Sequence, residues 1–518
     1  MKLRWLGSLA LVAPLAGCAA GGRRPPPKTE PEAARRAPVA LTLLYTSDEH
    51  GWVAPVRDAG KPRRVGAAAL LSLWRSAEGH CVPSSSRCEE SATIALSGGD
   101  NWTGPAISTF FKGEIAAITM RRLGYAAIAL GNHELDFGRA VFARNAEAQG
   151  IPYLAANVSP TRSEGGVAEA FTLVRRRGVA VGVVGLSTRK SPSAGLRDNY
   201  KGLTYGDEEP ALVRASIAAY AAGADVVVVV SHVCAEELEP IVLRHPELGL
   251  AFVGAGHCHR NEVRDAHGTP VVEPGSFLRG YVRIKLEVDI AAPARQKLTK
   301  PVIVEPVSLE RAADAPEDAE DPALSAEVAA YAAKTKAALG EVLGYADASI
   351  EPDSAPLANL ITDRWREVTK ADVAILNRFA TRQAIPKGPI TLETVHSVLP
   401  FDNNLVVMKL RGADLVHNVQ CCGGHVAGAT EIDGEVLLDG GKKIDPNAIY
   451  KVVSTDYAYA GGSGFTFEKA DPEGVVVEDW RAPLIRWLRA HPTNSEHPLG
   501  PMLDNRPRRP MKKRSDAH

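Results

Sequence analysis

The sequence has almost no net charge, because 60 lysine and arginine residues face 61 aspartate and glutamate residues in a chain of 518. Proteins that bind nucleic acid through its phosphate backbone carry a clear basic excess, so this balance argues against nucleic acid as the main partner. Hydrophobic residues make up 45% and charged residues 23% of the chain, as is ordinary for globular proteins. The length predicts two large domains or about three of average size.

Cysteine is scarce, and none of the seven residues stands in a Cys-x-x-Cys pair, so the sequence indicates no thiolate metal site. Cys81 and Cys88 enclose a short polar loop. In an exported protein they could form a disulfide or remain free. Cys421 and Cys422 are adjacent and indicate little. Cys258 stands between two histidines, and we expect it to pack in the interior rather than to bind metal.

The chain begins with a short basic segment and an apolar run that is too short to cross a bilayer comfortably. The run ends in LAGC, which resembles the lipobox of bacterial lipoproteins. We therefore predict a signal peptide over 1–18, lipidation of Cys18 and a place in the cell envelope, with the membrane contacted only through the lipid. Ala19 is similar to the outer-membrane sorting pattern, with the protein facing the periplasm or the surface. A plain secretory signal with another cleavage site is the alternative.

Composition divides the remaining chain into five parts. Residues 19–38 are rich in proline, glycine and charge, leave nothing to bury, and predict a disordered linker. Residues 39–308 alternate apolar runs with helical stretches, as layered α/β folds do. A linker and a connecting helix are expected over 309–344, and a second, smaller α/β domain over 345–503. Residues 504–518 predict a basic, disordered tail with solvated charges.

Five of the six apolar runs in the first domain end in residues that can bind metal. In an open α/β sheet the ligand site lies outside the carboxyl ends of the strands, so residues far apart in sequence meet there. Asp48 and His50 stand two apart, as do His257 and His259, and extended backbone would direct both members of a pair to one side. The predicted ligands are Asp48, His50, Asp100, Asn132, His232, His257 and His259.

This ligand set is too large for one tetrahedral ion and suits two. A site with oxygen and nitrogen donors and no thiolates favours Mn, Fe, Zn, Co or Mg, and the residue types do not show which of these ions binds. Two ions ~3.5–4 Å apart need a bridging carboxylate and clamp the attacking and leaving oxygens of an in-line displacement. Asp100 is the natural bridge. The sixth apolar run, residues 179–187, ends without such a residue and serves as an internal control.

The ordered motifs D-x-H, GDNWTG, GNHELD, Ser-His and GHCH resemble those of the calcineurin-like metallophosphoesterases. GTPVVEPGSFLRGYV is similar to a segment of the 5'-nucleotidase branch. This resemblance implies a two-sheet α-β-β-α sandwich. It implies one ion held by Asp48, His50, Asp100 and His259 and another held by Asp100, Asn132, His232 and His257. It also implies that His133 protonates the leaving group while Asp136, three residues on, fixes its tautomer.

Residues 345–503 resemble the C-terminal domain of bacterial 5'-nucleotidases, which grips the nucleotide. The resemblance implies substrate contacts from Arg382, Phe401, Asn403 and Tyr457, with the two rings around a base. The match is uneven, because Ser463 replaces the family's aspartate for the ribose hydroxyls. Glu351 and Asp353 stand where arginines are expected, and carboxylates there would repel a phosphate. Core packing is the alternative role for the two aromatic residues.

The resemblance implies a lipid-anchored phosphoesterase in which a metal-bound hydroxide attacks phosphorus in line. Nucleoside 5'-monophosphates are the leading substrates, and 2',3'-cyclic nucleotides or nucleotide sugars are the alternatives. A thiosulfohydrolase is less expected, because that branch of the family differs in its metal-site motif and its carrier-protein partner. A non-catalytic surface binding protein is also less expected, since the ligand set is complete. The sequence indicates neither the native metals nor the oligomeric state.

Overall fold

The computed structural model describes residues 37–56, 62–82, 86–161, 166–312 and 314–510. The predicted signal peptide, its Cys18 and nearly all of the predicted linker lie outside the described residues. Within the described ranges, no helix combines the length and the apolar character that a membrane span requires.

The first sheet of the N-terminal domain has six strands. In spatial order they are β15 (Ile303–Ser308), β14 (Gly280–Val288), β1 (Val39–Thr46), β3 (Thr93–Ser97), β4 (Tyr125–Ala129) and β5 (Tyr153–Leu154). Strands β1, β3, β4 and β5 run parallel, whereas β14 is antiparallel to β1. Parallel strands are covered on both faces, which explains why these segments are apolar without strict alternation.

The second sheet also has six strands. In spatial order they are β12 (Asn261–Ala266), β13 (Thr269–Pro274), β11 (Leu250–Gly254), β10 (Val226–His232), β8 (Val179–Ser187) and β7 (Phe171–Arg176). The inner strands β13, β11, β10 and β8 are parallel. Strand β10 begins with five valines and is buried along its whole length, as a central strand covered on both faces requires.

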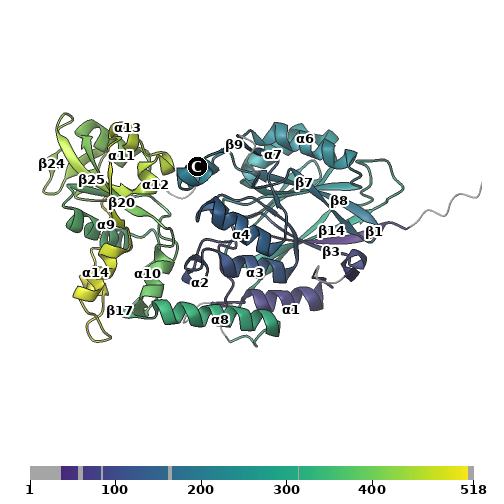
Figure 1. The fold of residues 1–518 in the computed structure, drawn as a ribbon, viewed down its shortest axis with the longest axis horizontal. Helices are drawn as coiled ribbons and strands as arrows, with labels where there is room; N and C mark the ends of the chain where they lie inside the picture. The colour runs from purple at the N-terminus through teal and green to yellow at the C-terminus, as the bar shows by residue number, and fades with distance from the viewer. Residues whose placement is uncertain (1–36, 57–61, 83–85, 162–165, 313, 511–518) are drawn as a thin grey trace, which may run out of the picture. The chain divides into compact units, whose positions relative to one another are not determined.

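The two sheets pack face to face through a shared apolar core, to which Leu43 and Leu96 contribute from the first sheet and Val228 and Phe252 from the second. Helices α1 (Ala67–Ala77), α3 (Glu114–Leu123) and α4 (Arg139–Gln149) contribute to the core on the outer side of the first sheet. Helices α6 (Glu208–Ala221) and α7 (Ala235–Arg244) contribute to the core outside the second (Figure 1). The predicted α-β-β-α sandwich is therefore confirmed.

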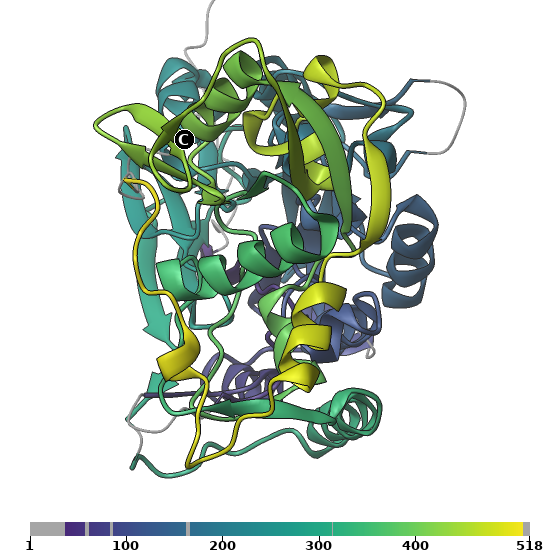
Figure 2. The same ribbon diagram turned by 90° about the vertical axis from the view of Figure 1, so that its left-hand side faces the viewer.

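Helix α8 (Pro322–Leu339) leads to a smaller α/β domain, as predicted. Its five-stranded sheet has the order β21 (His425–Ala427), β18 (Val373–Leu376), β25 (Ile449–Thr455), β20 (Asn404–Arg411) and β26 (Val475–Asp479). Helices α9 (Ala355–Thr369) and α14 (Ala482–Ala490) share one core with the sheet, and α11 (Gly412–Cys421) and α13 (Phe467–Ala470) share another. Figure 2 shows the molecule from the side of this domain.

The start of the predicted disordered tail, residues 504–510, is packed against the C-terminal domain, so the prediction is wrong for these residues. Arg508 pairs with Asp363 at 2.6 Å, and Arg509, which is only 7% exposed, pairs with Glu431 at 3.1 Å. The composition of this segment shows its positive charges, but it does not show the carboxylates that the fold places next to them. Residues 511–518 lie outside the described residues.

Six cysteines form three disulfides, Cys81–Cys88, Cys234–Cys258 and Cys421–Cys422. The first is one of the two states left open by the sequence. The expectation that Cys258 merely packs in the interior is incomplete, because it is buried and also bonded to Cys234. The bond between the adjacent residues Cys421 and Cys422 was not predicted.

Candidate functional site

The predicted metal ligands follow the carboxyl ends of neighbouring parallel strands. Asp48, Asp100 and Asn132 come shortly after β1, β3 and β4, and His232 is the last residue of β10. The loops approach one another so closely that a Cβ atom on Gly131 would lie 2.2 Å from Asp100 Oδ1. Only glycine fits there, and the sheet edge brings the ligands together as expected.

Asp100 lies at the centre of the cluster. Its Oδ2 atom is 3.0 Å from His232 Nε2 and 3.9 Å from His50 Nε2. His257 Nδ1 lies 3.3 Å from His232 Nε2. Asp100, His232 and His257 therefore form one group that could hold a metal ion.

Asp48 is the carboxylate of the neighbouring group. Its Oδ1 atom lies 3.3 Å from His259 Nε2 and 4.0 Å from His50 Nε2, and the two imidazole nitrogens are 3.1 Å apart. Asp48, His50 and His259 together could hold a metal ion. Because His50 lies within 4.0 Å of both carboxylates, the two groups adjoin.

Asn132 supplies a direct indication that a cation fits. Its Oδ1 atom is buried and has no hydrogen-bond partner among the described residues. Buried polar atoms are otherwise almost always satisfied, and an amide oxygen is a normal ligand for a hard cation. Asn132 and Asp100 line the same cavity, so the donor set and the orphaned oxygen both suit a metal.

Three of the predicted ligands, His50, His257 and Asp48, are held in the protonation state that metal binding needs. Burial lowers the pKa of His50 and lowers that of His257 to about 3, so both imidazoles are neutral near pH 7. Burial opposes ionisation of Asp48, but His259 and His232 lower its pKa to about 2. Burial likewise lowers the pKa of His232, but Asp100 raises it to about 10. Metal binding at His232 must therefore release a proton.

Backbone carbonyl groups orient two of the imidazoles. His50 Nδ1 lies 2.8 Å from the carbonyl of Thr103, and His232 Nδ1 lies 2.8 Å from the carbonyl of Gly98. With each Nδ1–H donating to a carbonyl, Nε2 is the nitrogen that faces the carboxylates, and at His232 it carries the proton that metal binding would release. Glu134 accepts from the backbone N–H groups of Asp100 and Gly131, both at 2.9 Å, and so holds the two loops together.

The backbone is left-handed at five of the seven predicted ligands, so the extended conformation predicted for the Asp48/His50 and His257/His259 pairs is wrong. The φ angles are 56° at Asp48, 46° at His50, 57° at Asp100, 75° at His257 and 58° at His259. The side chains converge because the chain turns sharply after each strand. Non-glycine residues adopt this region at a cost of ~1–3 kcal/mol each, and such residues cluster at functional sites.

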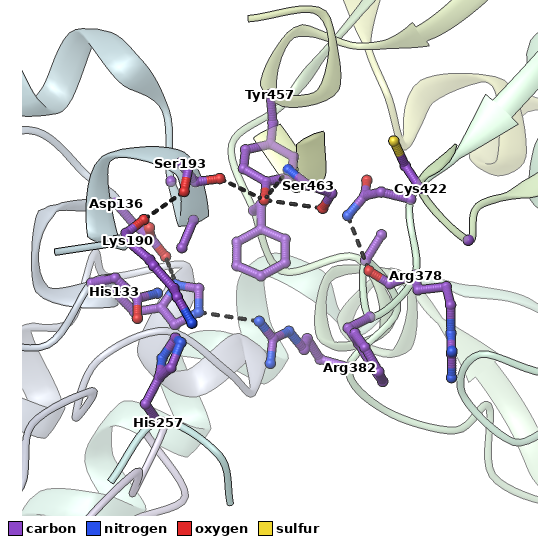
Figure 3. Close-up of a pocket in the computed structure, with 18 of the residues that line it drawn as sticks. His133, Asp136, Lys190, Ser193, His257, Arg378, Arg382, Cys422, Tyr457 and Ser463 are labelled. Atoms are coloured by element: carbon purple, nitrogen blue, oxygen red, sulfur yellow. Dashed lines mark hydrogen bonds and ion pairs between the residues drawn. The ribbon is translucent and has the colours of Figure 1, made fainter. Parts of the chain in front are cut away.

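His133 and Asp136 form a bonded pair beside this cluster, with His133 Nδ1 2.7 Å from Asp136 Oδ2. Burial lowers the pKa of His133, but Asp136 and Asp100 raise it above its ordinary value. The Nδ1–H donates to Asp136, so Nε2 is directed elsewhere, and Arg382 Nη2 donates to it at 3.1 Å. Figure 3 shows this chain from Asp136 through His133 to Arg382.

A cavity of about 600 Å³ extends from the metal-ligand cluster to the C-terminal domain. All four predicted substrate residues, Arg382, Phe401, Asn403 and Tyr457, line it. The ring of Phe401 stacks on that of His133 with centroids 5.5 Å apart, and the Arg382 guanidinium lies 5.2 Å from the Phe401 ring. Phe401 and Tyr457 are half-buried and line the cavity, and Phe401 also packs against the core of the C-terminal domain.

Asp353 does not present the repulsive charge that the sequence suggested. It lies 2.9 Å from His425 Nε2 and 3.2 Å from Arg378 Nε. These contacts lower its pKa against the effect of burial. Glu351, the other substituted position, is not among the residues that line the cavity. The substitution therefore removes arginines without adding a free carboxylate to the cavity.

Asn377 is a site residue that the sequence reasoning missed. It lines the cavity, is 7% exposed, and its buried Oδ1 atom has no hydrogen-bond partner among the described residues. A signal was present, because Asn377 directly follows β18, which ends at Leu376.

Comparisons with known proteins agree with this arrangement. Residues 332–420 match the family model described as 5'-nucleotidase, C-terminal domain. A 5'-nucleotidase of Vibrio cholerae is 24% identical over 519 residues, covering 88% of this chain and 90% of that protein. Endonuclease YhcR of Bacillus subtilis is 23% identical over 357 residues, or 64% of this chain, and the chain spans 28% of that protein.

Among solved structures, the chain is similar to a 5'-nucleotidase precursor from Thermus thermophilus. The TM-score is 0.76 with 23% sequence identity, and the match covers 91% of this chain and 99% of that one. The shared fold therefore extends over both domains. The resemblance that the motifs predicted is confirmed, and the lipid anchor stays a prediction.

Proposed function

We propose that this relative of the 5'-nucleotidases, a metal-dependent hydrolase of phosphate esters, acts on nucleoside 5'-monophosphates with two divalent ions. The observation that carries the proposal is the position of Asp100, which groups with His232 and His257 and also lies 3.9 Å from His50 of the Asp48/His50/His259 group, with the unsatisfied oxygen of Asn132 in the same cavity. A carboxylate shared between adjoining groups is what a two-metal centre needs.

Each ion would have its own ligands. Asp48, His50 and His259 would hold one ion, Asn132, His232 and His257 would hold the other, and Asp100 would be shared. Bound there, the ions would supply a nucleophile from water and neutralise charge on the phosphoryl oxygens. The donor set is compatible with Mn, Fe, Zn, Co or Mg.

His133 is suited to carry a proton at Nε2. The bond of its Nδ1–H to Asp136 fixes the ring orientation, and Nε2 lies at the cavity, where the departing oxygen of an ester would need a proton. Arg382 Nη2 lies 3.1 Å from this nitrogen. A planar guanidinium in this place can transfer its hydrogen bonds to phosphate oxygens, which would leave Nε2 to serve the leaving group.

The other end of the cavity suits a flat ring. Phe401 and Tyr457 supply aromatic surface, and Asn377 Oδ1 can accept an N–H from a nucleobase. The cavity volume of about 600 Å³ lies within the ordinary range of small-molecule sites. A molecule with a phosphate at one end and a base at the other matches both ends.

A panel of substrates tests this function. The purified protein, loaded in turn with Mn²⁺, Zn²⁺, Fe²⁺, Co²⁺ or Mg²⁺, would be assayed with 4-nitrophenyl phosphate, AMP, UDP-glucose and 2',3'-cyclic AMP. The proposal expects two ions per chain and the highest kcat/KM for AMP. A chain that binds no metal, or hydrolyses none of the esters with any metal, would contradict it.

The envelope location is a separate proposal, based on the LAGC segment that ends at Cys18. Three disulfides among the described residues support it, because disulfides persist in oxidising compartments outside the cytosol. Labelling of cells with a fatty-acid analogue is expected to mark the protein. Cys18→Ala should abolish the label, whereas Cys81→Ala should not. Equal labelling of the Cys18 variant would rule out an anchor at this residue.

A further inference from the structure

The segment that follows β8 passes beside the metal ligands without supplying one. This segment, residues 188–200, is termed the strap, and it ends in the short helix η3 (Arg197–Tyr200). The strap starts at the ligand cluster, because the Thr188 N–H donates to the carbonyl of His232 at 3.0 Å. The buried hydroxyl of Ser191 donates to the carbonyl of Thr188 at 2.8 Å and holds this start in place.

The end of the strap holds the turn that carries His133 and Asp136. The hydroxyl of Tyr200, a residue that is only 4% exposed, donates to the carbonyl of Asn132 at 2.7 Å. Asn199 Nδ2 donates to the carbonyl of Asp136 at 2.9 Å. The two bonds therefore hold this turn at its start and at its end.

The bond from Tyr200 acts on a peptide group that is also bonded at its other edge. This group joins Asn132 to His133, and its N–H donates to Asp100 Oδ1 at 2.7 Å. Because a peptide group is planar, bonds at both edges fix its orientation, and with it the direction in which the His133 side chain leaves the backbone. A displacement of ~1 Å caused by a distant change can cost ~10²-fold in rate.

The outer side of the strap contacts the C-terminal domain near Tyr457. Arg197 pairs with Glu468 at 2.6 Å and also donates to the carbonyl of Ala460. The Tyr457 hydroxyl donates to the carbonyl of Ser193 at 3.1 Å, as Figure 3 shows. The strap therefore contacts the turn that carries His133 on one side and an aromatic residue of the substrate end on the other.

The two sides of the strap pack directly against each other at Gly195. A Cβ atom on this residue would lie 2.6 Å from the hydroxyl oxygen of Tyr200. Only glycine fits so close to the tyrosine. Since no side chain separates the two sides, a displacement at the outer contacts reaches Tyr200 directly.

We propose that the strap couples the substrate end of the cavity to proton transfer by His133. Its positioning residues are Arg197, Asn199 and Tyr200, and none of the three is among the residues that line the cavity. They act through the backbone that they hold, so that Nε2 of His133 points at the departing oxygen when the outer contacts are made. This inference rests on the proposed function and deepens it by naming residues outside the cavity that the reaction needs.

The first experiment compares two substrates on the metal-loaded protein. AMP needs a proton on its departing oxygen, whereas 4-nitrophenolate departs without one. Asn199→Ala and Tyr200→Phe are each expected to lower kcat for AMP by ~10-fold, the effect of one lost hydrogen bond, and to leave kcat for 4-nitrophenyl phosphate unchanged.

Tyr153→Phe is the matched control for the tyrosine. Tyr153 is also 4% exposed, and its hydroxyl donates to Gln149 at 2.9 Å rather than to the turn at His133. This variant is expected to keep the wild-type kcat for both substrates. Equal losses for both substrates in Asn199→Ala and Tyr200→Phe would overturn the inference, because a merely structural role predicts that result.

The second experiment tests the coupling across the strap. Arg197→Ala is expected to lower kcat for AMP by ~2–5-fold, as suits an exposed ion pair, and to leave kcat for 4-nitrophenyl phosphate unchanged. In an Asn199→Ala/Tyr200→Phe background, Arg197→Ala should have no further effect, because residues that act on one another are not additive. A change confined to KM, or full additivity, would overturn the inference.

Arg489→Ala is the matched control for the ion pair. Arg489 pairs with Glu341 at 2.6 Å, and its side chain is 50% exposed, compared with 54% for Arg197. This variant is expected to match wild type with both substrates. A loss of kcat for AMP equal to that of Arg197→Ala would overturn the inference, since it would show that the effect does not depend on the strap.

The outcomes separate this inference from the proposed function. If wild type hydrolyses neither ester, the proposed function fails. If wild type hydrolyses both esters and the strap variants match it, only the inference fails. Thermal unfolding of each variant shows whether it is folded. Arg197→Ala changes an exposed side chain, so its two kcat values decide the matter if a variant at Asn199 or Tyr200 does not fold.

Discussion

The two ends of the cavity are built in different ways. At the metal end, the side chains follow adjacent strands of a two-sheet sandwich, and Asp100, His50 and His232 are almost fully buried. At the substrate end, Arg382, Phe401 and Tyr457 come from connecting segments and a short helix of the second domain and remain partly exposed. A sheet edge fixes several side chains at once, whereas each loop residue depends on its own contacts. Substitutions at the metal end should therefore lower activity more than substitutions at the substrate end.

The largest effect is expected at Asp100. Asp100→Ala removes the carboxylate that lies between the two ligand groups, 3.0 Å from His232 and 3.9 Å from His50, and it should abolish measurable turnover and reduce the metal content of the chain. Asp402→Ala is the matched control, since Asp402 also lines the cavity but lies 3.6 Å from Arg481 rather than among the histidines. The measurements are kcat/KM for 4-nitrophenyl phosphate and bound metal per chain. Normal turnover in Asp100→Ala would refute a shared carboxylate.

The next effect concerns proton transfer. His133→Ala should lower kcat for AMP by ~10²–10⁴-fold, the usual contribution of a general acid. The loss should be smaller for 4-nitrophenyl phosphate, whose leaving group departs without a proton. His497→Ala, which removes an exposed imidazole, serves as the control. Equal losses for both substrates would show that His133 does not protonate the leaving group.

A smaller effect is expected at the substrate end. Arg382→Ala should lower kcat/KM for AMP by ~10–100-fold, because a hydrogen bond to a charged group contributes ~1.5–3 kcal/mol. Arg382→Lys should lie between this variant and wild type, since lysine keeps the charge and loses the planar fork. Steady-state kinetics with AMP give both values. If AMP turnover is untouched in Arg382→Ala, the phosphate contact assigned to it is wrong.

The smallest effect on activity at saturating metal is expected from Cys234→Ala/Cys258→Ala. Cys234 follows His232 by two residues and Cys258 separates His257 from His259, so this disulfide joins two ligand-bearing loops. Loss of such supporting contacts costs ~10–100-fold in metal affinity. Competition with a chelator would measure this, with Cys81→Ala/Cys88→Ala as control. Unchanged metal affinity in this variant would show that the Cys234–Cys258 disulfide does not contribute to metal binding.

Much of the metal end could be predicted from the sequence, because apolar runs mark parallel strands and polar residues after them meet at one edge. The control run, β8, ends at Ser187 and indeed supplies no side chain to the ligand groups. The local backbone could not be predicted, because the left-handed turns at His257 and His259 leave no mark in the residue types. The Cys234–Cys258 disulfide depends on the contact between two loops, which sequence spacing does not show.

The substrate end was predicted less completely, because its properties depend on partners distant in sequence. From the sequence, the charge of Asp353 is expected to repel a phosphate. The fold places His425 and Arg378 beside it, and they balance this charge. From the sequence, the charge of Arg509 is expected to be solvated, but in the structure it pairs with Glu431. Charges in loops can be judged only together with the charges they meet.

The left-handed turns at the ligands have a consequence for the life of the protein in the cell. Five strained residues at ~1–3 kcal/mol each represent an energy comparable with the whole stability of a typical domain, ~5–15 kcal/mol. The same loops also bring buried imidazoles against one another, with His50 Nε2 3.1 Å from His259 Nε2. Starvation for divalent ions is therefore expected to do more than silence the protein: it should shorten its lifetime, so that abundance follows metal supply.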